Sequence, residues 1–297
     1  RLTGISGVTA MERTLELYCG EEGITLERFL RKNGISRRVI IALKRVPMGM
    51  TRNGELCRSV DVLHTGDRIC LHIPETEGCR PEPNVELIIP SVYEDEDIII
   101  FDKPAGVPVH QSCGHYGDSL ANAFAARFPD ATFRAVNRLD KDTSGLCLAA
   151  KSRIGANISS GDISKVYYAV CCGRVSEPLR IDMPIGREDG STIKRAVRDD
   201  GQRAVTNAYP LAGNERYTLL RVIIETGRTH QIRVHMSFMG FPLAGDGLYG
   251  GDCSDIGRQA LHCGEMELIH PVSGKKIITA SPFPEDMENL VKYLAKI

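Results

Sequence analysis

The stretch from Asn137 to Leu146 contains a carboxylate, Asp140, in a loop that leads into a predicted strand. Its residues, Asn-Arg-Leu-Asp-Lys-Asp-Thr-Ser-Gly-Leu, form a polar, turn-rich loop that runs into the apolar segment 146–150. The segment 142–145 favours a tight turn, because Asp, Thr and Ser side chains hydrogen-bond their own backbone and glycine accepts a positive φ. Asp140 therefore precedes a turn at the mouth of a predicted buried strand. An Asp in such a loop more often only caps the turn, but the nearby Arg138 and a second basic cluster favour a chemical role.

That second cluster is the segment 226–235, Thr-Gly-Arg-Thr-His-Gln-Ile-Arg-Val-His. It follows a strand-like run, 217–225, and turns into a predicted short helix with Thr229 as its N-cap. Arg228 and Arg233 are then expected near the helix start, where an arginine can meet an anion or a carboxylate. Each arginine alone is more often a solvated surface charge. Only the combination with Asp140 indicates a chemical role.

Together the two stretches resemble the pseudouridine synthases of the RluA type. In that family the catalytic loop reads His-Arg-Leu-Asp-x-x-Thr-Ser-Gly and the later motif reads Gly-Arg-x-His-Gln-Ile/Leu-Arg. Further segments resemble the family in the same order, and the resemblance covers roughly residues 95 to 297: they are 102–110 (Lys-Pro-x-Gly), 165–170 (Lys-x-Tyr-x-Ala), 242–250, 261–262 and 270–271. One position departs from the pattern, because Asn137 stands where the family has His.

The resemblance implies roles for individual side chains. Asp140 is the expected catalytic carboxylate, acting either as a nucleophile on the ribose or as a base that removes a ribose proton. Arg233 is its expected partner and would hold it ionised, while Tyr167 is expected against the target base. Arg138 is expected to fill the place that the flipped nucleotide vacates. The remaining expected substrate contacts are Arg228, His230 and Gln231.

Composition narrows the class of protein further. The 297 residues are 42% hydrophobic and 25% charged, as in ordinary globular proteins, and no apolar run is long enough to span a bilayer. The ten cysteines include no Cys-x-x-Cys pair, which argues against a structural zinc site. Several lie in apolar runs, as is typical of a reducing compartment. We expect a cytoplasmic monomer without a metal, and without a cofactor because the isomerisation involves no net oxidation.

The N-terminal part has a different charge pattern from the rest of the chain. Residues 26–73 hold ten Lys/Arg against four Asp/Glu, an excess of six, although the whole chain has a formal net charge of −1. The sequence predicts two short helices, the second capped by Ser36, and a hairpin turn at Asn53-Gly54. With the final Gly-Asp-x-Ile, these features resemble an S-four-like RNA-binding domain. The alternative interpretation is a solvated basic helix of a small accessory domain. The expected RNA contacts on the second helix are Arg37, Arg38, Lys44 and Arg45.

The sequence therefore predicts an α/β (α+β) protein in three parts. These are an S-four-like domain at 15–74, a linker at 75–94 that is rich in Pro and Glu, and a catalytic domain at 95–297. The resemblance implies a mixed, largely antiparallel central sheet with a cleft across its middle. The expected function is isomerisation of uridines in ribosomal RNA or, as the second choice, transfer RNA.

Two other classes of function stay open at this point. A catalytically inactive RNA-binding protein would keep the basic N-terminal part and a degenerate enzyme domain, but the presence of Asp140, Tyr167 and Arg233 argues against it. A glycosidase would also place an Asp beside a sugar. The later motif holds no second carboxylate for that chemistry.

Overall fold

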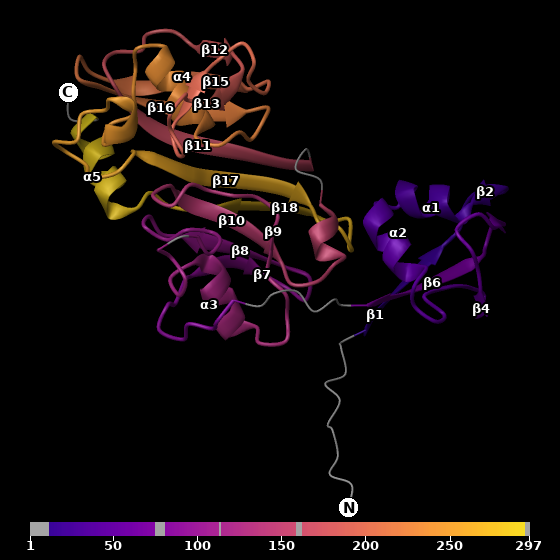
Figure 1. Ribbon diagram of the computed structural model, residues 1–297. Coiled ribbons are helices and arrows are strands. Elements are labelled where there is room, and N and C mark those ends of the chain that lie inside the picture. The colour runs from indigo at the N-terminus through magenta and orange to yellow at the C-terminus, as the bar shows by residue number, and fades with distance from the viewer. Residues whose placement is uncertain (1–11, 75–80, 113, 159–161, 295–297) are drawn as a thin grey trace, which may run out of the picture.

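The computed structural model describes residues 12–74, 81–112, 114–158 and 162–294. Figure 1 shows a small N-terminal unit beside a larger unit that is built on one sheet. Residues 75–80 of the predicted linker and 295–297 of the predicted catalytic domain lie outside the described residues. Within the described ranges, no helix has both the length and the apolar character needed to cross a membrane.

The N-terminal unit packs two short helices on a small sheet of strand order β1-β6-β3-β4, while β2 pairs with β5. Its elements are β1 (Glu12–Tyr18), β2 (Ile24–Thr25), α1 (Leu26–Lys32), α2 (Arg37–Leu43), β3 (Met50–Arg52), β4 (Glu55–Leu56), β5 (Val62–Leu63) and β6 (Arg68–Pro74). The Ser36 hydroxyl accepts a hydrogen bond from the Val39 N–H at 3.4 Å and caps α2, as predicted. Asn53 and Gly54 form the predicted hairpin turn, with φ of 53° and 92°. The apolar faces of the helices and of β6 close a separate core.

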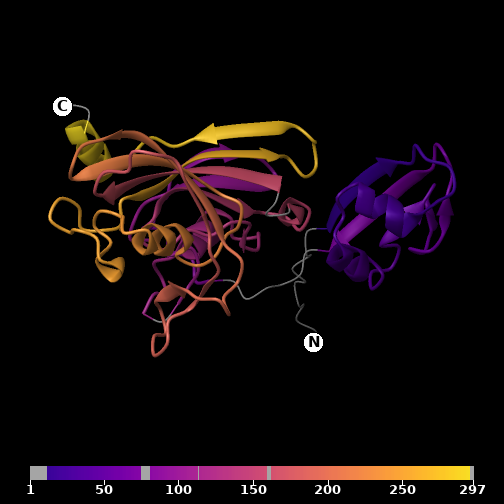
Figure 2. The same cartoon turned by 90° about the horizontal axis from the view of Figure 1, so that it is seen from above.

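The two units meet at η1 (Gly155–Asn157) of the larger unit. The Ser36 backbone N–H donates to Asn157 Oδ1 at 2.9 Å. Ile154, just before η1, is buried in the core of the N-terminal unit. Figure 2 shows the N-terminal unit standing to one side of the sheet, with this segment turned toward it.

The larger unit contains one ten-stranded sheet, and its main path runs β12-β15-β16-β11-β17-β10-β8-β7. In that order the strands are β12 (Leu179–Asp182), β15 (Val205–Gly213), β16 (Tyr217–Ile224), β11 (Ile163–Cys172), β17 (Leu261–Ile269), β10 (Ser144–Ala150), β8 (Ile98–Lys103) and β7 (Ser91–Glu94). Off this path, β18 (Lys276–Ala280) pairs with β17 and β9 (Arg134–Ala135) pairs with β10. β7 falls at the end of the range predicted as linker. The predicted mixed, largely antiparallel sheet is confirmed, since β10 and β17 form its parallel pair.

β17 joins two groups of strands that are separate in the sequence. It pairs antiparallel with β11 through residues 261–268 and parallel with β10 at Ser144 and Gly145. Gly145 has φ +104°, and a Cβ there would lie 2.2 Å from the carbonyl oxygen of Cys263. A glycine is therefore required where the two strands cross. The loop before β10 is fixed to the sheet at this point.

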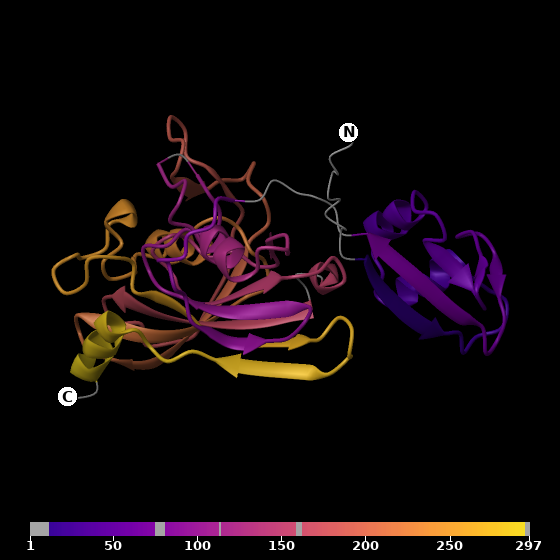
Figure 3. The same ribbon diagram turned by 90° about the horizontal axis from the view of Figure 1, so that it is seen from below.

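Helices cover both faces of the sheet (Figure 3). On one face lie α3 (Leu120–Arg127) and α4 (Gln231–Phe238), whose apolar side chains share a core with β8, β10, β11 and β17. On the other face, α5 (Glu285–Leu294) packs against β16 and β11 in a smaller core. A small hairpin of β13 (Ile185–Arg187) and β14 (Arg195–Val197) contacts α4.

Candidate active site

A cleft of about 720 Å³ opens on the face of the sheet that carries α4. Its lining comes from the loop before β10, the start of β11 and the segment 224–233. All seven residues predicted for catalysis or substrate contact line it: Arg138, Asp140, Tyr167, Arg228, His230, Gln231 and Arg233. The central cleft is thus confirmed, and it brings together motifs that lie far apart in the sequence.

Asp140 and Arg233 form the ion pair that the sequence predicted. Arg233 Nη1 lies 3.2 Å from Asp140 Oδ2, across 93 positions of sequence. The Asp140 side chain is 26% exposed toward the cleft, whereas that of Arg233 is only 8% exposed. The pair therefore places a carboxylate oxygen at the cleft, with a buried guanidinium beside it.

A second carboxylate, that of Asp246, also binds the Arg233 guanidinium. Arg233 Nε donates to Asp246 Oδ2 at 2.7 Å and Arg233 Nη2 donates to Asp246 Oδ1 at 2.9 Å, a two-pronged contact. Burial alone would lower the pKa of Arg233, but Asp246 and then Asp140 outweigh burial and raise it. The guanidinium also lies over the ring of Tyr249, 5.0 Å from its centre. Arg233 is thus locked in place before any substrate arrives.

Sequence reasoning gave Asp246 no role. Its segment, 242–250, resembles the family, and the Gly-Asp-Gly within it is the signal that could have pointed to a tight turn. Gly245 has φ +75°, and a Cβ there would lie 1.9 Å from the Arg258 carbonyl oxygen, so this turn demands glycine. The turn places Asp246 under α4 with 1% of its side chain exposed.

The start of α4 differs from the prediction. The N-cap is His230 rather than Thr229, and His230 has the left-handed φ of 57°. This backbone turns the imidazole into the cleft, where Nδ1 lies 2.8 Å from the Tyr249 hydroxyl and Nε2 lies 3.9 Å from Asp140 Oδ2. Burial lowers the pKa of His230 more than the nearby Asp140 raises it. His230 is therefore neutral at pH 7.

Gln231 has both ends of its side-chain amide engaged within the protein. Its oxygen accepts from the Thr226 hydroxyl and the Arg228 N–H, at 2.8 and 3.0 Å. Its nitrogen donates to the Val205 carbonyl and to Thr206 Oγ1, at 2.9 and 3.1 Å. These four bonds use the full capacity of an amide. Gln231 thus shapes the loop before α4, and its amide has no donor or acceptor left for the expected substrate contact.

Arg228 and Arg138 are both exposed at the cleft. The Arg228 side chain donates to the Arg203 carbonyl and to Gln202 Oε1, at 3.1 and 2.8 Å. Arg138 has no ion-pair or hydrogen-bond partner among the described residues. The two arginines therefore offer positive charge where solvent and a polyanion can reach it.

Tyr167 lies on the floor of the cleft. Its side chain is buried, at 6% exposure. Burial, followed by the proximity of Cys263 and Asp140, raises the pKa of Tyr167 well above its usual range. The phenol therefore keeps its proton at physiological pH, and in the free protein Cys263 is a hydrogen-bond partner for it.

Two buried side chains fix the loop that carries Asp140. Asn137 Nδ2 donates to the Leu146 carbonyl at 3.3 Å, and Asn137 Oδ1 accepts from the Leu148 N–H at 2.6 Å, so its amide pairs with β10 as a strand would. Lys103 is fully buried, and its ammonium donates to the carbonyls of Pro104, Val107 and Lys141 at 2.8, 2.8 and 2.9 Å. Burial lowers the pKa of Lys103 to about 8, while the three carbonyls favour its charged form. Sequence reasoning identified the Lys103 segment without giving the residue a role.

Comparison with known proteins identifies the family. The family model described as RNA pseudouridylate synthase matches residues 97–238. An uncharacterised RNA pseudouridine synthase of Bacillus subtilis is 39% identical over 282 residues, covering 91% of this chain and 99% of that protein. The chain belongs to the RNA pseudouridine synthases.

Further relatives agree with this assignment. The ribosomal large subunit pseudouridine synthase D of Pseudomonas aeruginosa is 39% identical over 269 residues, covering 82% of this chain and 83% of that protein. The solved structure of the human RNA pseudouridylate synthase domain containing 1 matches with a TM-score of 0.58 and 22% identity, covering 73% of this chain and 98% of that one. At that identity the structural likeness supports the fold of this synthase.

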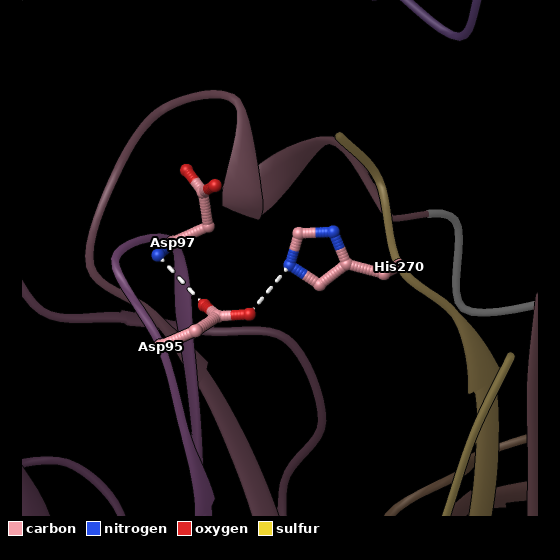
Figure 4. Close-up of side chains that lie close together, drawn as sticks. All are labelled: Asp95, Asp97 and His270. Carbon is pink, nitrogen blue, oxygen red and sulfur yellow. Dashed lines mark hydrogen bonds and ion pairs between the residues drawn. The ribbon is translucent and has the colours of Figure 1, made fainter. Parts of the chain in front are cut away.

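Outside the cleft of the synthase, Asp95, Asp97 and His270 are spaced like metal ligands, with candidate atoms within 4.8 Å of one another (Figure 4). His270 Nδ1 accepts from the Val272 and Ser273 N–H groups at 3.2 and 3.0 Å. A neutral ring must then carry its proton on Nε2, which lies 2.9 Å from Asp95 Oδ2 without forming a hydrogen bond to it. Metals bind histidine through a free lone pair. These three side chains therefore join the end of β17 to the β7–β8 turn and offer no complete metal site.

The predicted RNA contacts of the N-terminal unit lie on α2 and directly after it. Arg37, Lys44 and Arg45 are exposed along and just after α2, and they have no ion-pair partner among the described residues. The side chain of Arg38 lies outside the description. Charges of this kind are free to meet phosphates.

Proposed function

We propose that this synthase isomerises uridine in ribosomal RNA of the large subunit. Relatives named ribosomal large subunit pseudouridine synthase D from Pseudomonas aeruginosa and Xanthomonas campestris are 39% and 38% identical and extend over 82% of the chain. This repeated likeness over most of the chain carries the proposal. Transfer RNA is the second candidate substrate. A ribosomal substrate also favours a cytoplasmic location, and we propose that the synthase acts there as a monomer.

In this proposal Asp140 is the catalytic residue. Its carboxylate faces the cleft beside Arg233, where it can attack the anomeric carbon or remove a ribose proton. The two routes use the same carboxylate. Arg233 orients Asp140, and Asp246 holds Arg233 in place.

The surrounding residues receive the flipped nucleotide. A uridine within structured RNA must leave its stack, at a cost of a few kcal/mol. We propose that Tyr167 lies against the base, that Arg138 enters the vacated position and that Arg228 meets a phosphate. His230, neutral and close to Asp140, serves as a hydrogen-bond partner for the ribose. No redox cofactor enters this scheme, because substrate and product are isomers.

We propose that the N-terminal unit is an S-four-like RNA-binding domain spanning 15–74. Two features support it: the paired helices on a small sheet, and the exposed unpaired charges of Arg37, Lys44 and Arg45. Arg38 belongs to the same proposal. Such charges bind phosphates without reading sequence, so this unit would supply affinity while the cleft selects the uridine.

The test is a map of pseudouridines in RNA from cells that lack this protein. We expect one or a few sites to disappear from large-subunit ribosomal RNA and to return when the wild-type gene, but not the Asp140→Asn variant, is restored. Loss of sites from transfer RNA alone would replace ribosomal RNA by the second candidate. Unchanged maps of both RNAs would contradict the substrate proposal.

A further inference from the structure

Lys165 is a cation on the floor of the cleft that the expected catalytic set does not include. It lines the cleft together with Tyr167. Both residues lie on β11, separated by one position, at the point where the pairing of β11 with β17 shifts register between Val166 and Tyr167. Lys165 thus faces the same cleft as Tyr167.

Within the part of the chain that the structure describes, the ammonium group of Lys165 has no counter-charge, since no carboxylate or carbonyl there forms an ion pair or hydrogen bond with it. The groups that act on it electrostatically are two thiols, Cys263 on β17 and Cys147 on β10. Burial raises the pKa of both thiols to about 12, so both are neutral. Burial likewise lowers the pKa of Lys165 itself.

A half-buried cation without a partner is unfavourable in the free protein and becomes favourable when negative charge arrives. The other cation deep in this cleft, Arg233, is already bound by two carboxylates, Asp140 and Asp246. Arg138 and Arg228 are exposed and suit the phosphates, which remain at the surface. Lys165 is therefore the cation best placed for charge that develops on the inserted base.

The reaction creates such a charge. When Asp140 bonds to the anomeric carbon or removes a ribose proton, the electron pair of the bond between that carbon and base N1 leaves with the base. The base then carries one negative charge, shared by N1 and its two carbonyl oxygens. After the base turns, C5 donates an electron pair to form its bond to the anomeric carbon. The Asp140–carbon bond breaks in this step, or, on the other route, Asp140 returns the ribose proton. C5 then loses one proton and N1 gains one, which gives a neutral base and regenerates the carboxylate of Asp140.

We propose that Lys165 is a catalytic residue that stabilises the detached uracil anion by donating a hydrogen bond to one of its oxygens. The lysine keeps its proton throughout and adds no atom to the product. Its effect belongs to the step in which the base departs, because the neutral uridine before that step has little charge to attract it. The inference rests on the proposed role of Asp140 in this cleft.

The test compares single-turnover rates and RNA affinities of the parent, Lys165→Met and Lys165→Arg on one RNA. Losing one preorganised donor to a developing anion typically costs ~100-fold or more in rate. We expect that loss for Lys165→Met, with RNA affinity within about threefold of the parent, since the contact forms only in the transition state. Lys165→Arg should recover most of the rate. The matched control is Lys276→Met, which removes an exposed lysine of β18 that pairs with Glu267 and lies outside the cleft.

Two outcomes would overturn the inference. A parent-like rate for Lys165→Met would remove the lysine from the reaction. Weaker RNA binding with a shallower salt dependence, at an unchanged saturating rate, would make Lys165 a phosphate contact. Absence of turnover in the parent itself on every RNA tried would instead overturn the proposed function, so the two failures are distinguishable.

The variant Lys165→Met could act by removing the charge of the lysine or by changing the packing of the cleft. A second substrate distinguishes these two effects. RNA with 5-fluorouridine at the target releases a base whose anion is stabilised by the fluorine, so departure needs the lysine less. We expect the penalty of Lys165→Met on cleavage of the glycosidic bond to be several-fold smaller on this RNA than on uridine RNA. An equal penalty on both would show that the residue acts through shape, and would overturn the inference.

Discussion

The basic side chains of the N-terminal unit and those of the cleft carry the same charge but differ in their partners. Arg37, Lys44 and Arg45 are exposed and unpaired among the described residues, whereas Arg233 is buried between two carboxylates. An exposed cation attracts a polyanion over a distance set by salt. A buried, paired one fixes geometry instead. The comparison predicts that charge removal will weaken binding in the first region and abolish chemistry in the second.

The largest effect is expected for Asp140→Asn. The amide keeps the shape of the side chain but cannot act as a nucleophile or base, so turnover should fall to background while RNA binding stays within a few fold. Single-turnover pseudouridine formation and a filter-binding titration measure the two quantities. Substantial product from this variant would contradict the catalytic assignment.

Arg233→Ala should damage both chemistry and stability. Removing the guanidinium leaves Asp246, with 1% of its side chain exposed, as an unpaired buried charge, which typically costs ~3–5 kcal/mol. The free energy of unfolding in urea should fall by about that amount, and turnover should be lost. Arg233→Lys keeps the charge without the two-pronged geometry and should retain part of the activity. Full activity of Arg233→Ala would contradict the pairing argument.

The N-terminal charges should behave in the opposite way. The triple variant Arg37→Ala, Lys44→Ala, Arg45→Ala should weaken RNA binding ~10–100-fold at low salt and reduce the slope of log affinity against log salt by ~0.9 for each phosphate that the variant no longer binds. The saturating single-turnover rate should not change, because the cleft is untouched. A parent-like salt slope would show that this face is only solvated.

Two buried histidines, His235 and His262, should make the free energy of unfolding depend on pH. Burial lowers the pKa of His235 and of His262, and each ring is enclosed by neutral hydrogen-bond partners. The unfolded chain therefore binds protons near pH 6.5 that the folded chain does not, so the free energy of unfolding should fall as the pH drops from 7.5 to 5. Urea titrations at both pH values measure it. His235→Gln should show a smaller loss than the parent, and an identical loss would exclude His235 as a cause.

The smallest effect is expected for Asn137→His, which restores the residue usual in the family. Asn137 pairs with the backbone of β10, a structural role that a neutral imidazole can partly fill with one donor and one acceptor. The single-turnover rate should stay within about tenfold, or ~1.4 kcal/mol. Asn137→Ala should lose more by loosening the loop. A parent without turnover that gains activity from Asn137→His would show that position 137 transfers protons.

The local features of the fold could be predicted from the sequence. The Ser36 cap and the Asn53-Gly54 turn depend on neighbouring residues alone, and both were predicted correctly. The family resemblance brought Asp140 and Arg233 together, and the 3.2 Å contact confirms that pairing. The N-cap of α4 was predicted wrongly, because the hydrogen bonds of Gln231 to β15 hold the loop and leave His230 in the left-handed region.

The roles of other side chains depend on contacts between segments far apart in the sequence, which a local pattern cannot predict. Asp246 gains its role only when the turn 245–251 folds under α4, and Lys103 gains its role when two loops offer it three carbonyls. From the sequence alone, Lys165 is an ordinary charged residue of a predicted strand. Its burial near the neutral thiols of β10 and β17 follows only from the packing of the three strands.

The position of β17 has a consequence for how the synthase is made. The strands β7, β8 and β10 are synthesised first and β11 to β16 next, yet the two groups meet only through β17, which ends at Ile269. Until β17 has left the ribosome, β10 and β11 each expose an unpaired strand edge. Such an edge can pair with strands of other chains. Closure over so long a separation in sequence is slow. The cleft can therefore form only after β17 has been synthesised, and we expect the need for chaperones to be greatest before that point.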